Sequence, residues 1–163
     1  MNTDPILRDH LVKLLSWQSA HVGFDEAIDG IPPERRGQQP EGLPFSLWQL
    51  LEHLRLAQYD ILEFCRNPDY TEGVWPDDYW PDTIAPPNPE AWDTSLAQFR
   101  ADRQAMQELV GDAGTDLYTP IPHGDGQTIL REAVLLADHN AYHVGQIVAV
   151  RRLLGIWPPR HEA

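Results

Sequence analysis

The fold is decided by residues 128–154, which read TILREAVLLADHNAYHVGQIVAVRRLL. This stretch contains no proline, and its apolar residues recur every three or four positions, as they do on the buried face of a helix. Gly155 follows it, and Pro158 and Pro159 come soon after. At about 1.5 Å of rise per residue, such a helix is about 40 Å long and spans the domain.

Two further proline-free stretches have clear start signals. Ser46 and Gln49 form the S-x-x-Q pattern of a capping box, which predicts a helix that continues until Asn67 and Pro68. Near the N-terminus, Asp4 and Pro5 suit a cap and a first helical turn, and we expect a helix over residues 6–20 with Leu7, Leu11, Leu14 and Gln18 on its buried face.

The remaining stretches complete the helical set. Asn88 and Pro89 predict the start of another long helix, and Gly111 predicts its end in a left-handed conformation. Residues 24–28 suit one short helical turn. No segment alternates apolar and polar residues over a sustained length, so we expect no sheet.

These patterns predict an all-α protein, an antiparallel four-helix bundle that forms a single domain over residues 1–163. Its connections are long and rich in proline. The segment 67–89 holds six prolines, five acidic residues and no basic one. Its aromatic residues Trp75, Tyr79 and Trp80 indicate that it packs against the bundle. We expect it to overhang the functional site that the bundle carries.

Composition excludes several classes of protein. The chain has 12 Lys+Arg against 25 Asp+Glu, and its net charge of −13 disfavours nucleic-acid binding. It has no long apolar run and no signal-peptide pattern, so we expect a cytoplasmic protein without a membrane partner. The single cysteine, Cys65, excludes an internal disulfide and a cysteine-based zinc site, and we expect a buried, inert thiol.

The seven histidines are the residues that can carry chemistry as a group. His139 and His143 are spaced i,i+4, which stacks both rings on one helix face, and His53 lies at the edge of the apolar stripe of another helix. Three imidazoles from two helices would form a metal site with open positions. The alternative is a set of core histidines hydrogen-bonded to neighbours, such as Asp138, Gln146 or Tyr142.

Other chemistries lack their motifs. The H-N-x-x-H spacing has no glutamate base of a zinc metalloprotease, and residues 123–126 lack the lysine of a phosphate-binding loop. His21 is the next candidate to line a pocket. Glu52 and Asp138 adjoin the histidines in sequence, but neighbouring helical residues point elsewhere, so the catalytic residues stay unknown.

Three stretches together resemble the DinB-like (damage-inducible) superfamily over essentially the whole chain: residues 130–146 with 151–155, residues 44–53, and the loop at Tyr79-Trp80-Pro81. The resemblance implies a four-helix bundle that is often a homodimer. It also implies that the family's metal triad corresponds to His53, His139 and His143, with a divalent transition metal, zinc or nickel, as the cofactor.

Characterised members of that superfamily include transferases that add bacillithiol or mycothiol to an electrophile, and a thiol-dependent isomerase. The resemblance therefore implies a metal-dependent enzyme of thiol-transferase type, or a hydrolase, that acts on a small molecule with a low-molecular-weight thiol. One alternative is a non-catalytic metal-binding stress-response protein in which the metal is structural. Another is an interaction module whose aromatic residues serve a dimer interface.

Overall fold

The computed structural model describes residues 4–16 and 20–158. These residues form five α-helices, of which all but α2 are long: α1 (Asp4–Leu14), α2 (Phe24–Ile28), α3 (Leu47–Arg66), α4 (Ala91–Gly111) and α5 (Ile129–Leu153). Two 3-10 turns, η1 (Pro33–Arg35) and η2 (Asp77–Tyr79), lie in the connections. The described residues contain no strand, only an isolated bridge between Pro120 and Thr128, so the all-α prediction is confirmed.

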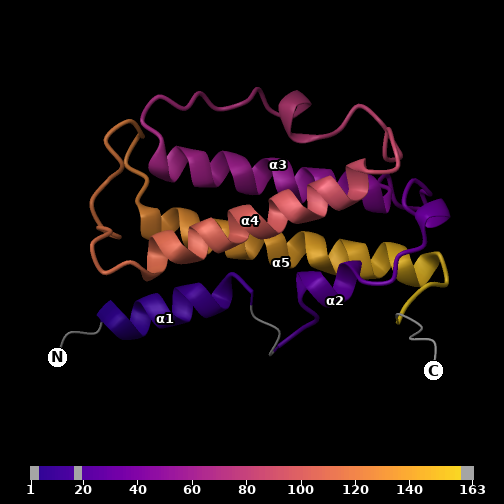
Figure 1. Cartoon of the computed structure of the whole chain (residues 1–163), viewed down its shortest axis with the longest axis horizontal. Helices are drawn as coiled ribbons and strands as arrows, with labels where there is room; N and C mark the ends of the chain where they lie inside the picture. The colour runs from indigo at the N-terminus through magenta and orange to yellow at the C-terminus, as the bar shows by residue number, and fades with distance from the viewer. Residues whose placement is uncertain (1–3, 17–19, 159–163) are drawn as a thin grey trace.

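The helices do not simply alternate in direction, as an antiparallel bundle would. Gln58 of α3 donates a hydrogen bond to the carbonyl of Phe99 in α4, while Trp48 and Ala91, near the two helix starts, line one cavity. The start of α3 therefore lies beside the start of α4, and the middle of α3 lies beside the middle of α4, so the two helices run in the same direction. The reason is the 67–89 connection, which crosses the length of the bundle before α4 begins (Figure 1).

α1 and α2 lie one after the other along the same side of the bundle (Figure 1). The predicted first helix was too long, because α1 ends at Leu14, and Gln18 lies outside the described residues. Leu11 and Leu15 are buried whereas Leu14 is 39% exposed, so the predicted buried face was partly wrong. The predicted turn at residues 24–28 is confirmed as α2.

The start of α3 and the whole of α5 agree with the sequence analysis. The amide of Gln49 donates to Ser46 Oγ at 3.1 Å, and the amide of Ser46 donates to Gln49 Oε1 at 3.1 Å, which completes the capping box. α5 begins after Thr128, whose hydroxyl accepts a bond from the amide of Arg131. Gly155 follows its end with a φ of 72°, a value that favours glycine.

α4 ends at Gly111 as predicted, but its start and the conformation at its end differ from the prediction. The helix begins at Ala91, after Glu90, rather than at Pro89. Gly111 is its last residue and has no positive φ, because the chain leaves through an extended Asp112. The Arg8 guanidinium donates to the carbonyls of Val110 and Asp112, so this helix end is satisfied by a side chain of α1 rather than by a left-handed glycine.

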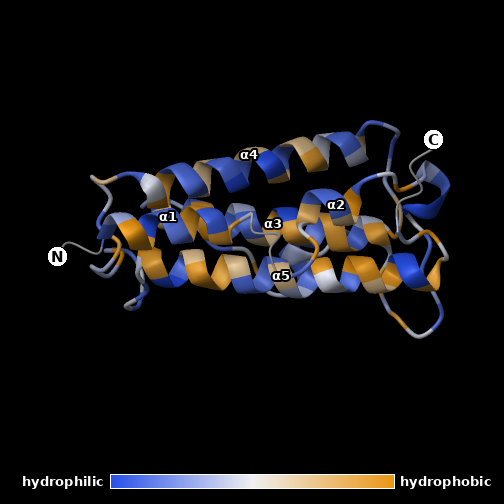
Figure 2. Ribbon diagram, turned by 90° about the horizontal axis from the view of Figure 1, so that it is seen from below, coloured by the Kyte–Doolittle hydropathy of each residue, from blue (hydrophilic) through white to orange (hydrophobic). Residues whose placement is uncertain are grey.

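The core divides into two apolar clusters along the bundle, one beside α2 and one beside α1. Hydrophobic and hydrophilic residues follow one another along α5, as a helix between core and solvent requires (Figure 2). The first cluster is centred on Leu47, Leu50, Leu51, Leu54 and Ile147, and the second on Leu62, Met106, Val110, Leu117 and Leu136. None of the described helices combines the length and apolar composition that a membrane crossing requires.

The 67–89 segment packs along α3, as its aromatic residues predicted. Trp48 Nε1 donates to Thr83 Oγ1 at 3.1 Å, and Ser46 Oγ donates to the carbonyl of Ile84 at 2.6 Å. Trp75 is the exception among Trp75, Tyr79 and Trp80, because it is 66% exposed. The segment therefore covers the N-terminal half of α3, the half that carries His53.

Candidate metal centre

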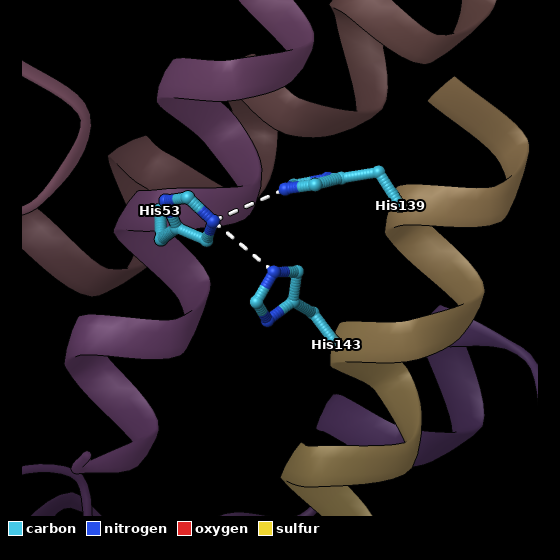
Figure 3. A group of neighbouring side chains, drawn as sticks. All are labelled: His53, His139 and His143. Carbon is cyan, nitrogen blue, oxygen red and sulfur yellow. Dashed lines mark hydrogen bonds between the residues drawn. The ribbon is translucent and has the colours of Figure 1, made fainter. Parts of the chain in front are cut away.

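Three histidines from two helices meet between α3 and α5 (Figure 3). His53 Nε2 lies 3.1 Å from His139 Nε2 and 3.1 Å from His143 Nε2. The helices run antiparallel here, and His139 and His143 are one turn apart on α5, so both rings face His53. The three residues predicted from the sequence are therefore brought together.

Each of the three rings has an oxygen acceptor at its other nitrogen. His53 Nδ1 lies 2.8 Å from the carbonyl oxygen of Tyr79, and His143 Nδ1 lies 2.7 Å from Gln146 Oε1. His139 Nδ1 lies 3.5 Å from Asn140 Oδ1. A carbonyl oxygen only accepts, so these partners place the proton of a neutral ring on Nδ1 and leave a lone pair on Nε2.

All three rings are neutral near pH 7. Burial, with a smaller effect of the neighbouring His143, lowers the pKa of His53 to about 4, although the bond to the Tyr79 carbonyl acts in the opposite direction. Burial and the two other rings lower the pKa of His139 to about 4. Burial also lowers the pKa of His143, although its bond to Gln146 acts in the opposite direction.

This arrangement suits a cation. Three lone pairs converge here, those of His139 and His143 each 3.1 Å from that of His53, and they repel one another unless a positive centre lies between them. Two nitrogen ligands about 2.1 Å from one metal ion and about 90–110° apart are about 3.0–3.4 Å from each other, which includes the separation found here. The residues present therefore fit a divalent transition metal.

The family model described as the DinB superfamily matches residues 17–147, a range that includes all three histidines. The chain belongs to the DinB superfamily. Comparison with the curated proteins and with the solved structures gives no significant match.

In this DinB superfamily chain, aromatic rings surround the centre. Trp80 stacks on His53, and Phe45 stacks on Trp80 with ring centroids 4.5 Å apart. Tyr142, which is 65% exposed, contacts the edge of His143. His53 and His143 are buried and His139 is half-buried, so the cluster reaches the surface beside His139.

The other candidates lie elsewhere. The exposed His21 hydrogen-bonds the carbonyl of Val22 and does not join the cluster. Glu52 pairs with Arg55, and Asp138 is exposed, so neither carboxylate belongs to it. Cys65 is buried, as predicted, and burial raises the pKa of its thiol to about 12, which disfavours the reactive thiolate.

Sequence reasoning named Gln146 only as a partner of a core histidine, and it did not find Asn140 or the Tyr79 carbonyl. The structure combines the two readings of the histidines, since hydrogen bonds at Nδ1 and convergence at Nε2 occur in the same rings. The three-residue spacing from His143 to Gln146 is the signal that was available for this contact.

Proposed function

We propose that this protein is a metal-dependent enzyme of thiol-transferase type, in which His53, His139 and His143 hold a divalent transition metal, zinc or nickel. The observation that carries the proposal is the convergence of three neutral Nε2 atoms whose Nδ1 atoms are all engaged by acceptors. Membership of the DinB superfamily supports it.

The donor set suits catalysis more than a closed structural site. A divalent ion held by neutral nitrogens keeps its positive charge and lowers the pKa of a bound thiol or water. Structural zinc sites normally have four protein ligands, and the described residues supply three that converge. His139 is half-buried, so this side of the cluster is the one that a small-molecule electrophile and a low-molecular-weight thiol would approach. If water takes the place of the thiol, the same site would serve a hydrolase.

A second function has an observation of its own. His53 lies on α3, and His139 and His143 lie on α5, so a bound metal would link the two helices through two buried side chains. This favours, as the alternative, a non-catalytic stress-response protein in which the metal stabilises the bundle.

We further propose a cytoplasmic homodimer that binds no nucleic acid. The net charge of −13 supports the last point, because an acidic surface repels a phosphate backbone. Gel filtration with light scattering tests the dimer, and filter binding at low salt tests the absence of nucleic-acid binding.

Elemental analysis of the purified protein tests the metal centre. We expect about one transition-metal ion per chain, strongly reduced in His53→Ala and His143→Ala and unchanged in the control His21→Ala, whose ring is exposed. A protein that binds no metal would overturn both functions.

Turnover separates the two functions. The loss of free thiol is followed with bacillithiol, mycothiol, glutathione or coenzyme A and a panel of electrophiles. Thiol consumption that disappears in His53→Ala supports the enzyme. Bound metal without turnover on any pair, together with a lower unfolding midpoint after chelation, supports the structural role instead.

A further inference from the structure

A cavity lies at the end of the bundle where α3 and α4 begin, and none of the three histidines of the metal centre lines it. Its volume is about 740 Å³, and its two walls are the segments 33–38 and 85–89. The cationic residue that lines it is Arg36. Glu34, Pro86 and Pro89 also line it.

Both walls are anchored to the start of α3. The carbonyl of Arg36 accepts a hydrogen bond from the amide of Trp48 at 2.8 Å, which fixes the first wall. The carbonyl of Ile84 accepts one from Ser46 Oγ at 2.6 Å, which fixes the second. The walls also touch, because a Cβ atom on Gly37 would collide with Ala85. The cavity is therefore formed in advance of any ligand.

The Arg36 side chain is held in place but has no anionic partner. Its guanidinium carbon lies 4.6 Å from the ring centroid of the buried Trp92, and its Nε is buried without a hydrogen bond. Among the described residues, seven basic side chains form ion pairs with carboxylates, namely Arg8, Lys13, Arg55, Arg66, Arg100, Arg103 and Arg131. In a chain with a net charge of −13, an oriented guanidinium that lines a cavity and has no carboxylate partner is suited to bind an anion.

We propose that this cavity binds a small organic carboxylate, whose carboxylate pairs with Arg36 and whose apolar part lies against Pro86 and Pro89. A carboxylate matches the planar fork of arginine with two parallel hydrogen bonds. The exposed Glu34 lines the same cavity without an ion pair to Arg36, and it disfavours a more highly charged anion such as phosphate. Stacking on Trp92 leaves the edge of the guanidinium for this contact.

The test uses benzoate as the probe and the full-length protein. Benzoate is titrated while the Nε–H signal of Arg36 is followed by NMR, with that signal assigned from its absence in Arg36→Lys. We expect a saturable shift with benzoate and none with benzamide, which has the same shape without the charge. Because a carboxylate also binds metal ions, the titration is repeated in His143→Ala, where the same affinity is expected.

Two variants change the affinity in opposite directions. Calorimetric titration with benzoate should show at least about a tenfold loss in Arg36→Gln and no change in the control Arg152→Gln, which removes an exposed arginine. Glu34→Gln should strengthen binding by about two- to threefold, because a nearby negative charge is removed.

The Glu34→Gln result keeps the test informative if Arg36→Gln fails to fold, since Glu34 is exposed. Benzoate affinity that is unchanged in a folded Arg36→Gln overturns the proposal. Equal binding of benzamide or of inorganic phosphate, or an affinity that Glu34→Gln does not raise, also overturns it.

Discussion

The indole of Trp80 lies flat on the imidazole of His53, with ring centroids 4.0 Å apart and the two planes inclined by 2°. Phe45 covers the other face of the indole at 12°. Tyr79, the residue before Trp80, supplies the carbonyl oxygen that accepts the hydrogen bond from His53 Nδ1. The 67–89 segment therefore fixes both the plane and the tautomer of this histidine, from outside the two helices that carry the cluster.

Replacing Trp80 tests this relationship. We expect Trp80→Leu to weaken metal binding by about tenfold, because His53 loses the surface that holds its plane. Competition with a chromophoric chelator measures the affinity. Trp75→Leu is the matched control, since Trp75 is exposed and meets His53 only at 6.2 Å, and its metal affinity should not change. Equal affinities in the two variants would contradict the role assigned to the stack.

Gln146 orients His143 in a similar way, from one turn further along α5. Gln146→Leu removes the acceptor at Nδ1 and should lower metal affinity by about 10–100-fold. Gln146→Glu keeps an acceptor oxygen and should retain most of the affinity, which a merely space-filling residue would not explain. Gln104→Leu, an exposed change on α4, is the control. If Gln146→Glu is as weak as Gln146→Leu, the hydrogen bond is not the cause.

Local sequence signals predicted the elements that local chemistry specifies. The capping box joins Ser46 and Gln49 within one helix start, and the i,i+4 histidines share a face wherever α5 lies, so both features were predictable. The position of His53 at the edge of an apolar stripe predicted it as a third ligand, and the family resemblance supported the same triad. Chain direction was not predictable in this way, because helical periodicity is the same in both directions, and the parallel course of α3 and α4 was missed.

Contacts between distant segments were also missed. The stack of Trp80 on His53 joins positions far apart in sequence, and no pattern of residues announces it. The conformation at the end of α4 was mispredicted for the same reason: the helix ends at Gly111 as predicted, but Arg8 of α1 satisfies its last carbonyls and no left-handed glycine is needed. Arg151 is fully buried although it is charged, since it donates to the carbonyls of Ala27 and Ile156.

The histidine cluster should make the metal-free protein less stable in acid. The folded pKa of His53 and of His139 is about 4, below the ordinary 6.5, so the folded state binds fewer protons than the unfolded state. Their contribution is complete above about pH 6.5 and is lost as the pH falls towards 4. With solvent screening allowed for, we expect a loss of about 1–2 kcal/mol in the free energy of unfolding between these limits.

Urea titrations across this pH range measure the effect. The double variant His53→Ala with His139→Ala should show a smaller loss than the parent chain, whereas the exposed His21→Ala should follow the parent. A parent profile that the double variant reproduces would show that other groups cause the acid sensitivity.

Arg8 should be the most sensitive charged residue of α1 for stability. Its buried guanidinium pairs with Asp4 at 2.7 Å and donates to the carbonyls of Val110, Asp112 and Thr115, so it joins α1 to the end of α4. Arg8→Ala leaves buried acceptors without a donor and should lower the free energy of unfolding by about 2–4 kcal/mol.

Lys13→Ala is the control, because it breaks an ion pair of the same i,i+4 spacing that is exposed at both ends, and it should cost less than about 0.5 kcal/mol. Denaturant unfolding measures both variants. Arg8→Lys keeps the charge but cannot reach all of these acceptors, so its stability should lie between those of Arg8→Ala and the parent. If Arg8→Lys matches the parent, charge alone holds α1 in place, and the carbonyl contacts of the guanidinium do not stabilise the fold.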